Sequence, residues 1–244
     1  MSKALYIITG ASRGMGEAMA RQLLAPEHRV IGISRGQSTA TGFEQWPHDL
    51  AHAPLAAALA LQDWLAAQAP DAFNSACLIN NAGMVAEPGP VDEGSLEDLS
   101  AAIRVGLEAA LLMSSAFLRG TAALGSKRRV LHISSGLGRR AMAGSAAYCA
   151  AKAGLDNLAR AMALDEAQKP GGAAVVALAP GIIDTDMQRQ LRSADPSRFP
   201  DHAVFVNFKT SGQLMSPDEA AAKVLRYLAR ADFGQQVIAD IRDI

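Results

Sequence analysis

The chain has 244 residues, 50% hydrophobic and 19% charged, which is typical of a globular protein with enough apolar material for one sizeable core. Its formal net charge of −1 argues against binding to the phosphate backbone of nucleic acids. The two cysteines form neither a disulfide framework nor a metal-ligand spacing, so we expect no metal site.

The amino-terminal sequence MSKALYIITG enters a strand pattern directly, without the basic and apolar regions of a signal peptide. No apolar run approaches the ~20 residues that a membrane-spanning helix needs. We therefore expect a cytoplasmic protein that has neither a membrane nor a nucleic acid as its partner.

Short apolar runs and longer helical patterns alternate along the chain. Strands are predicted at 5–9, 29–34, 43–49 (weakly), 76–80, 129–135, 173–180 and 235–241. Helices are predicted at 14–25, 54–69, 96–124, 147–168 and 217–230. Most of the strands are continuously apolar, as expected of parallel strands buried on both faces. The order predicts one α/β domain over residues 1–244, a doubly wound Rossmann fold whose parallel sheet of about seven strands carries helices on both faces.

A glycine-rich loop, TGASRGMG at residues 9–16, follows the first predicted strand and opens a helix. Its glycines allow a tight turn and bring backbone N–H groups against a pyrophosphate, which the positive end of the helix also attracts. A glycine-rich turn can be only a turn, but this position favours a dinucleotide site. The loop residues expected to contact the cofactor are Gly10, Ser12, Arg13, Gly14, Met15 and Gly16.

Two arginines favour NADP(H) over NAD(H). Arg13 lies inside the loop, and Arg35 follows the second predicted strand, where an adenosine ribose is recognised. NAD sites commonly place an acidic residue there, whereas an arginine suits the additional 2′-phosphate of NADP. Asp49, at the end of the weak third strand, and its neighbour Leu50 are predicted near the adenine. A solvated turn aspartate is the alternative interpretation of Asp49.

Residues 185–215 interrupt the alternation of strands and helices. The segment has mixed polarity, three aromatic residues and two prolines, and it follows the carboxyl end of a predicted strand. Ligands bind at that edge of doubly wound sheets, and the segment is longer than a usual connection. We expect a partly mobile substrate lid; an ordinary surface excursion is the alternative.

The sequence SAAYCAAKAG (145–154) places Tyr148 and Lys152 four residues apart on one face of a predicted helix. A phenol with its ordinary pKa of about 10 transfers protons poorly near neutral pH. A neighbouring ammonium favours the phenolate, and lowering that pKa by ~3 units corresponds to about 4 kcal/mol. The pair is therefore a candidate acid tuned by a cation.

Four motifs occur in order: TGASRGMG, NNAG at 80–83, YCAAK at 148–152 and PGIIDT at 180–185. With them the chain resembles the short-chain dehydrogenase/reductase family over essentially its whole length. Within that family, INNAGMV, AYCAAKAGLD and APGIIDTDMQRQLRS are closest to the branch of sepiapterin reductases and bacterial benzil reductases. The resemblance implies an NADP(H)-dependent oxidoreductase.

The resemblance also implies roles for particular residues. Tyr148 would be the general acid of carbonyl reduction, Lys152 would bind the nicotinamide ribose, and Ser135 would hydrogen-bond the carbonyl oxygen. One departure stands out, because Gly106 occupies the position where the family usually carries an asparagine that holds a relay water. Further cofactor contacts are expected from Asn81, Ala82, Gly83, Pro180, Gly181, Ile183 and Thr185.

The substrate pocket is less well defined by the sequence. By resemblance to sepiapterin reductases, Asp240 would hold a pterin; a polar residue that ends the last strand is the alternative. Apolar side chains suit a flat ketone, but they are also ordinary core residues. The apolar candidates are Leu137, Met142, Met187, Leu191, Phe199, Phe205 and Phe208.

The leading hypothesis is an NADPH-dependent carbonyl reductase of a 1,2-dicarbonyl, benzil-like or sepiapterin-like substrate. A 3-oxoacyl reductase or an alcohol or sugar dehydrogenase is the alternative within the family. A non-catalytic NADP(H)-sensing protein is the alternative outside enzymes. In this family the two long helices commonly pair across a two-fold axis, so we expect a homodimer, or else a tetramer.

Overall fold

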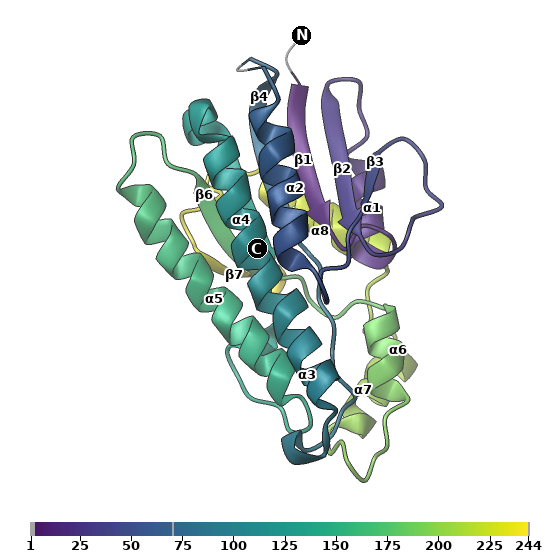
Figure 1. Ribbon diagram of the computed structural model, residues 1–244. Helices are drawn as coiled ribbons and strands as arrows, with labels where there is room; N and C mark the ends of the chain where they lie inside the picture. The colour runs from purple at the N-terminus through teal and green to yellow at the C-terminus, as the bar shows by residue number, and fades with distance from the viewer. Residues whose placement is uncertain (1–2, 70, 244) are drawn as a thin grey trace.

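A parallel sheet between two layers of helices forms the core of the protein (Figure 1). The computed structural model describes residues 3–69 and 71–243. Within them the sheet has seven strands in the order β3-β2-β1-β4-β5-β6-β7, and each pair is parallel. The strands are β1 (Lys3–Thr9), β2 (His28–Ser34), β3 (Glu44–Pro47), β4 (Phe73–Asn80), β5 (Arg128–Ile133), β6 (Ala174–Ala179) and β7 (Ile238–Asp240). The predicted doubly wound fold is confirmed.

The main helices occupy the predicted intervals and differ chiefly at their ends. They are α1 (Gly14–Gln22), α2 (Pro54–Ala66), α3 (Leu96–Ile103), α4 (Ala109–Gly120), α5 (Ala146–Ala167) and α8 (Pro217–Leu228). Helix α8 begins with a capping box, in which Ser216 and Glu219 bond each other's backbone N–H groups. Five short 3₁₀ or π turns lie between the described elements: η1 (Val91–Glu93), η2 (Arg104–Glu108), η3 (Ala122–Lys127), η4 (Gly136–Gly138) and η5 (Ile241–Asp243).

Each face of the sheet has its own hydrophobic core. On one face, α1 and α8 pack side chains such as Met19 and Val224 against Ile8 and Leu131. On the other face, α2, α4 and α5 cover the sheet around residues such as Phe117. Because both faces are covered, the inner strands are apolar at successive positions, which explains the continuous hydrophobic runs. The catalytic candidates lie outside the strands themselves, since Ser135 follows β5 and Tyr148 and Lys152 belong to α5.

The long predicted helix at 96–124 is interrupted in its middle. It consists of α3, the π turn η2, and α4, followed by the 3₁₀ segment η3. Among the described residues, Leu96–Gly120 is the one helical span long and apolar enough to cross a membrane. Its α4 portion packs Met113 and Phe117 into the core beside α2 and the sheet, as a core helix of this fold does.

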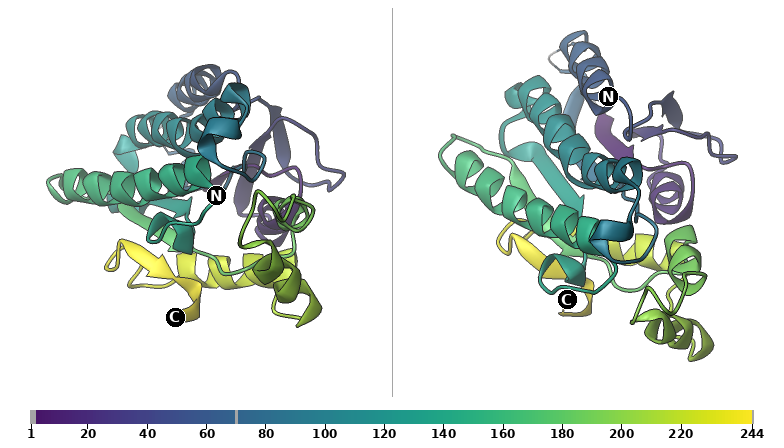
Figure 2. Two further views of the ribbon diagram at one scale, coloured as in Figure 1. Left: turned by 90° about the horizontal axis from the view of Figure 1, so that it is seen from below. Right: turned by 60° about the horizontal axis from the view of Figure 1, so that its bottom comes forward.

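The segment at 185–215 contains two helices, α6 (Asp186–Arg192) and α7 (His202–Thr210), where the sequence predicted no regular structure. Figure 2 shows these light-green helices together, apart from the layers that cover the sheet and beyond the carboxyl ends of the strands. An ion pair of 2.6 Å between Lys209 and Asp184 connects α7 to the chain that enters the segment. We refer to residues 185–215 as the lid segment.

Candidate active site

Four strand ends bring the sequence motifs together at one edge of the sheet. The glycine loop follows β1, the NNAG motif ends β4, Ser135 follows β5, and the PGIIDT motif follows β6. Because the strands are parallel, all four carboxyl ends meet at the same edge. The tertiary structure thus collects motifs from residue 9 to residue 185 at the edge where doubly wound sheets bind their ligands, and we call this region the cleft.

The glycine loop is locked against the end of β4. The Thr9 hydroxyl accepts the backbone N–H groups of Asn81 and Ala82 at 3.0 Å each, and the Asn81 side chain donates to the Thr9 carbonyl at 3.0 Å. Gly10 has a φ of +69°, and a Cβ atom there would lie 2.9 Å from the Cα atom of Ala82. Only a glycine fits this turn. Thr9 was not among the predicted site residues, although it stands directly before the first glycine.

The same loop leaves a cradle that fits a pyrophosphate. Helix α1 begins after Arg13, and no side chain caps its first backbone N–H groups. Unsatisfied N–H groups at a helix start attract phosphate. A Cβ atom on Gly16 would lie 2.5 Å from the Asn81 side-chain nitrogen and still closer to the Gly10 carbonyl oxygen. The cradle therefore depends on glycine at positions 10 and 16, as a dinucleotide site requires.

The predicted adenosine contacts lie at the edges of this cradle. Arg35 is exposed at the end of β2 and makes no hydrogen bond or ion pair within residues 3–69 and 71–243. Arg13 is ion-paired with Asp186 of the lid segment at 3.0 Å. The Asp49 carboxylate accepts the Ala51 backbone N–H at 2.9 Å and also contacts His52. Those hydrogen bonds, with the nearby positive charges, outweigh partial burial and keep the pKa of Asp49 below its usual value.

Two other predicted cofactor residues point away from the cleft. Met15 is 6% exposed and belongs to the core under α1 and α8. Leu50 is 6% exposed and belongs to the core under α2 and α4. These two residues therefore offer the cleft their backbone atoms, while their side chains stabilise the two helical layers.

Tyr148, Lys152 and Ser135 are brought together as expected. Lys152 is 3% exposed, its ammonium lies 5.5 Å from the centre of the Tyr148 ring, and it donates to the Ile133 carbonyl at 2.7 Å. The Ser135 hydroxyl accepts the Leu137 backbone N–H at 3.1 Å and also hydrogen-bonds Tyr148. A phenol, an ammonium and a hydroxyl from two elements thus share one site.

Burial dominates the acid–base properties of this site. It raises the pKa of Tyr148 to about 12, although the hydrogen bond with Ser135 favours the phenolate. Burial also lowers the pKa of Lys152 to about 8, while the nearby Asp156 carboxylate favours the charged amine. The sequence argument expected a lowered phenol pKa. In this structure desolvation of the phenolate outweighs the hydrogen bond with Ser135, so the pKa is raised instead.

Gly106 lies buried in the π turn η2, beside α5. A Cβ atom at this position would be 2.9 Å from the Cβ atom of Ala151, the residue before Lys152. Glycine therefore allows η2 to approach α5 more closely than any other residue would. An asparagine could be restored only if one of these helical segments moved.

The PGIIDT residues form the other wall of the cleft. Gly181 has a φ of +86°, and a Cβ atom there would lie 2.7 Å from the Met215 side chain. Ile183 pairs with Met215 in an isolated parallel bridge that closes the base of the lid segment. Thr185 begins α6 without making a side-chain cap, so its hydroxyl remains available to a ligand. Two further predicted cofactor residues differ in exposure. Pro180, directly after β6, is buried, and Gly83, in the NNAG motif after β4, is exposed.

The predicted apolar substrate residues form one cluster beside Tyr148. Phe199 is fully buried in it, stacked on Phe205 with ring centres 5.4 Å apart, and Phe208 follows at 5.7 Å from Phe205. A hollow of about 10 Å³, roughly the space of one water molecule, adjoins Tyr148 and is lined by residues from 85–99 and 144–148, none of which belongs to this cluster. The remaining members of the cluster are Leu137, Met142, Cys149, Met187, Leu191 and Ala194.

Asp240 lies at the end of β7 and is 6% exposed. Its carboxylate accepts two side-chain hydrogen bonds from Arg242, at 2.6 and 2.8 Å, and lies 3.7 Å from Arg139. The hydrogen bonds from Arg242 hold the pKa of Asp240 below its usual value. This environment favours the structural interpretation of Asp240 over the contact with a pterin that the resemblance implied.

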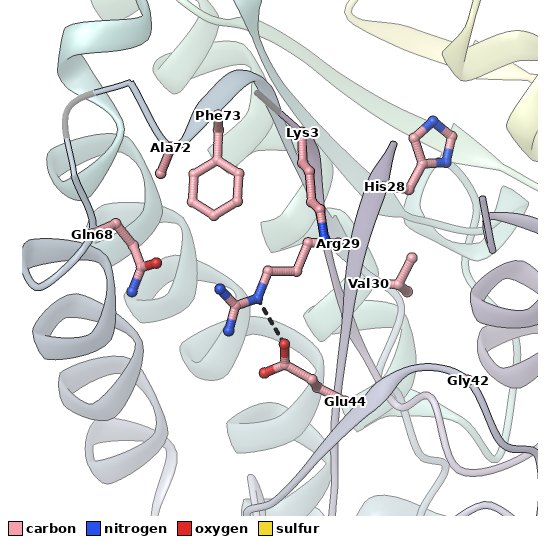
Figure 3. A pocket seen from close by; sticks show the side chains of 9 residues that line it. All are labelled: Lys3, His28, Arg29, Val30, Gly42, Glu44, Gln68, Ala72 and Phe73. Carbon is pink, nitrogen blue, oxygen red and sulfur yellow. Dashed lines mark hydrogen bonds and ion pairs between the residues drawn. The ribbon is translucent and has the colours of Figure 1, made fainter. Parts of the chain in front are cut away.

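A surface hollow of about 430 Å³ lies at the opposite edge of the sheet, where β1, β2 and β4 begin (Figure 3). Its most prominent charge, Arg29, is ion-paired with Glu44 at 2.7 Å and lies over the Trp64 ring at 4.7 Å. The hollow is far from the Tyr148 site because the strands separate the two edges. Within the described residues no group of three or more His, Cys, Asp or Glu side chains is arranged to hold a metal ion.

Comparisons with known proteins agree with this site. The model of the short chain dehydrogenase family matches residues 4–196. Benzil reductase ((S)-benzoin forming) of Bacillus cereus is 33% identical over 242 residues, covering 94% of this chain and 95% of the relative. Sepiapterin reductase of Rattus norvegicus is 30% identical over 265 residues, covering 99% and 97%.

A solved structure from Beutenbergia cavernae, classed as an NAD(P)-dependent gluconate 5-dehydrogenase and holding NADP at low occupancy, superimposes with a TM-score of 0.79. It is 27% identical, and the alignment covers 99% of this chain and 96% of that one. The family match spans most of the chain, and the ordered motifs meet in one cleft. The chain belongs to the short-chain dehydrogenase family of NAD(P)(H)-dependent oxidoreductases.

Proposed function

We propose that this oxidoreductase is an NADPH-dependent carbonyl reductase that acts either on a 1,2-dicarbonyl compound such as benzil or on a sepiapterin-like α-hydroxyketone. The observation that carries the proposal is the Tyr148, Lys152 and Ser135 set beside an apolar, aromatic cluster. That arrangement offers a proton donor and a hydroxyl to a carbonyl oxygen. It also offers an apolar surface to the rest of a flat ketone.

In the proposed reaction, Tyr148 donates its phenolic proton to the ketone oxygen, and Ser135 hydrogen-bonds the same oxygen as negative charge develops on it. NADPH, when bound, supplies the hydride. Lys152 stabilises the resulting phenolate by its charge, since its ammonium lies 5.5 Å from the Tyr148 ring. Lys152 would also hold the nicotinamide ribose, and the Thr185 hydroxyl would bind the nicotinamide carboxamide.

The preference for NADPH over NADH rests on Arg35. Its guanidinium is exposed where β2 ends, and no acidic side chain is ion-paired with it among the described residues. An arginine binds a 2′-phosphate by charge and by paired hydrogen bonds, which NADH cannot use. Arg13 would contribute once its guanidinium leaves Asp186. The glycine cradle at residues 10–16 would hold the pyrophosphate of either cofactor.

The substrate class rests on the cluster around Phe199 and on the likeness to benzil reductase and sepiapterin reductase. Both relatives align along nearly the whole of this chain. A second carbonyl next to the reacting one makes a ketone more electrophilic. Thioether and aromatic side chains such as Met142, Met187 and Phe199 suit a flat aromatic substituent.

The test is oxidation of NADPH and of NADH, followed at 340 nm, with benzil, diacetyl and sepiapterin. The expected result is turnover with at least one of them, faster with NADPH, and a loss of about 1,000-fold in kcat for Tyr148→Phe. Arg35→Glu should reverse the cofactor preference without a loss of kcat. NADPH binding with no Tyr148-dependent turnover would favour a sensor, and turnover confined to 3-oxoacyl thioesters or sugars would overturn the substrate assignment.

We also propose that the enzyme acts in the cytoplasm as a homodimer joined through α4 and α5. The outer faces of these helices carry the exposed side chains Leu111 and Leu164. Such apolar surface favours association with a second copy. Mass photometry should give a dimer, and Leu164→Glu should shift it toward the monomer; an unchanged mass for both proteins would contradict this interface.

A further inference from the structure

Both ends of the loop that carries Ser135 contact a single buried carboxylate. We call residues 134–139 the serine loop. At its start, the Ser134 hydroxyl donates a hydrogen bond to one oxygen of Asp156. At its end, Arg139 donates to the other oxygen from Nε at 3.3 Å. Asp156 is 1% exposed, so these two contacts replace the hydrogen bonds with water that the buried carboxylate cannot make.

Asp156 belongs to the same helix as the catalytic pair. It lies one turn after Lys152 and two turns after Tyr148, on the same face of α5. The serine loop lies directly on this helix. A Cβ atom on Gly138 would be 2.8 Å from the Lys152 carbonyl oxygen and 3.1 Å from Asp156. The carboxylate and the glycine together set the distance between the serine loop and α5.

The end of the serine loop at Arg139 is also bonded to the last strand, β7. Arg139 donates to the Ala239 carbonyl at 2.9 Å and lies 3.7 Å from Asp240, which is itself bonded to Arg242. This arrangement gives Asp240 a structural task at the end of β7. It also means that Arg139 has partners on both sides and cannot rotate without losing them.

We propose that Asp156 is a positioning residue, which clamps both ends of the serine loop against α5 and thereby keeps the Ser135 hydroxyl beside Tyr148. The inference rests on the proposed function, because Ser135 matters only if a carbonyl is reduced at this site. Asp156 touches neither the substrate nor the reacting atoms. It acts through the geometry of Ser135 and through its charge, which favours the ammonium of Lys152.

The test compares Asp156→Asn with a matched control on the same helix. Glu166 is 2% exposed and bonds Arg128 at 3.3 Å and the Ala173 backbone N–H at 2.8 Å, but it lies at the other end of α5. Glu166→Gln therefore removes an equally buried charge far from Ser135. For each variant, kcat, the KM for the ketone, the Kd for NADPH and the melting temperature are measured.

Asp156→Asn should lower kcat and kcat/KM together by about 100-fold, since it misplaces a group that acts in the transition state. The Kd for NADPH should change by less than about threefold. Glu166→Gln should lower the melting temperature and leave kcat unchanged. If Asp156→Asn keeps the wild-type kcat, or if Glu166→Gln loses as much kcat, the clamp is refuted and Asp156 is merely a stabilising residue.

Hydrogen–deuterium exchange separates the clamp from the proposed function because it needs no substrate. Exchange across residues 134–139 should be faster in Asp156→Asn and unchanged in Glu166→Gln. Faster exchange in an enzyme that reduces no ketone would contradict the proposed function and keep the clamp as a structural device. If Asp156→Asn does not fold, Ser134→Ala removes one end only and should lower kcat about tenfold; a wild-type kcat there refutes the clamp.

Discussion

The two halves of the active-site cleft are held by different forces. On the cofactor side, backbone geometry dominates: the Gly10 turn, the Thr9 hydroxyl and the Asn81 amide join the ends of β1 and β4. On the substrate side, the lid segment is held by side-chain packing around Phe199 and by surface ion pairs. The comparison teaches that the substrate pocket can change while the cofactor site stays the same. Other side chains can replace those packed around Phe199, but no other residue can replace the glycine of the turn.

The largest expected effect comes from a substitution on the cofactor side, Gly16→Ala. Gly16→Ala places a Cβ atom against the Gly10 carbonyl and 2.5 Å from the Asn81 side chain, so the loop must open. We expect a loss of about 4 kcal/mol in the free energy of unfolding and no measurable NADPH binding. The control is Gly36→Ala, where the nearest atom would lie 3.8 Å away and stability should stay within about 0.5 kcal/mol. Chemical denaturation checks both; equal stability would contradict the backbone account.

The second largest effect comes from a substitution that disturbs the substrate side alone, Phe199→Ala. Phe199→Ala removes a fully buried ring from the cluster, which should cost about 3 kcal/mol in the free energy of unfolding. The KM for the ketone should rise about tenfold or more, whereas the Kd for NADPH stays near the wild-type value. Phe199→Leu should recover most of the loss. Weakened NADPH binding in Phe199→Ala would show that the two halves are coupled.

A third, smaller effect concerns the close contact between η2 and α5 at Gly106. Gly106→Asn would bring a Cβ atom to 2.9 Å from that of Ala151, and overpacking of this kind costs about 2 kcal/mol. We therefore expect the asparagine to lower the melting temperature and to leave kcat no higher than in the wild type. A faster enzyme of unchanged stability would mean that the helices yield easily and that proton delivery limits the rate.

The smallest effect is a pH dependence. Burial lowers the pKa of Lys152 to about 8, so the free enzyme loses this positive charge as the pH rises through that value. Because the charged amine is the useful form, kcat/KM should fall about tenfold per pH unit above pH ~8. Burial also lowers the pKa of His132 to about 3, so this histidine stays neutral above that pH and adds no second step to the pH profile of kcat/KM. A profile that stays flat to pH 10 would contradict the assignment.

The same Lys152 shift affects stability in a predictable direction. The unfolded chain holds this proton up to its ordinary pKa of about 10.4, while the folded state releases it near 8. Between these values the unfolded state binds more protons, so Lys152 makes the folded state more stable as the pH rises. Lys152→Met should remove that contribution, which urea titrations at pH 7 and pH 10 can measure.

The sequence by itself determined the fold class and the order of the elements. It also indicated Tyr148 and Lys152 as catalytic candidates, since a Tyr–Lys pair one turn apart is a local pattern, whereas Ser135 followed from the family resemblance. The apolar residues proposed for the substrate pocket also pack together in the structure, around Phe199. Local patterns also determined the start of α8, where Ser216 and Glu219 form the capping box.

Only the tertiary structure decided how these pieces are supported. That the lid segment is helical, that Asp240 faces Arg242, and that Asp156 bonds both Ser134 and Arg139 depend on contacts between residues far apart in the chain. The direction of the Tyr148 pKa also depended on burial, which raises it although the local pattern places an ammonium one turn away. Spacing along a helix predicts which side chains are neighbours, but desolvation is set by everything that packs around them.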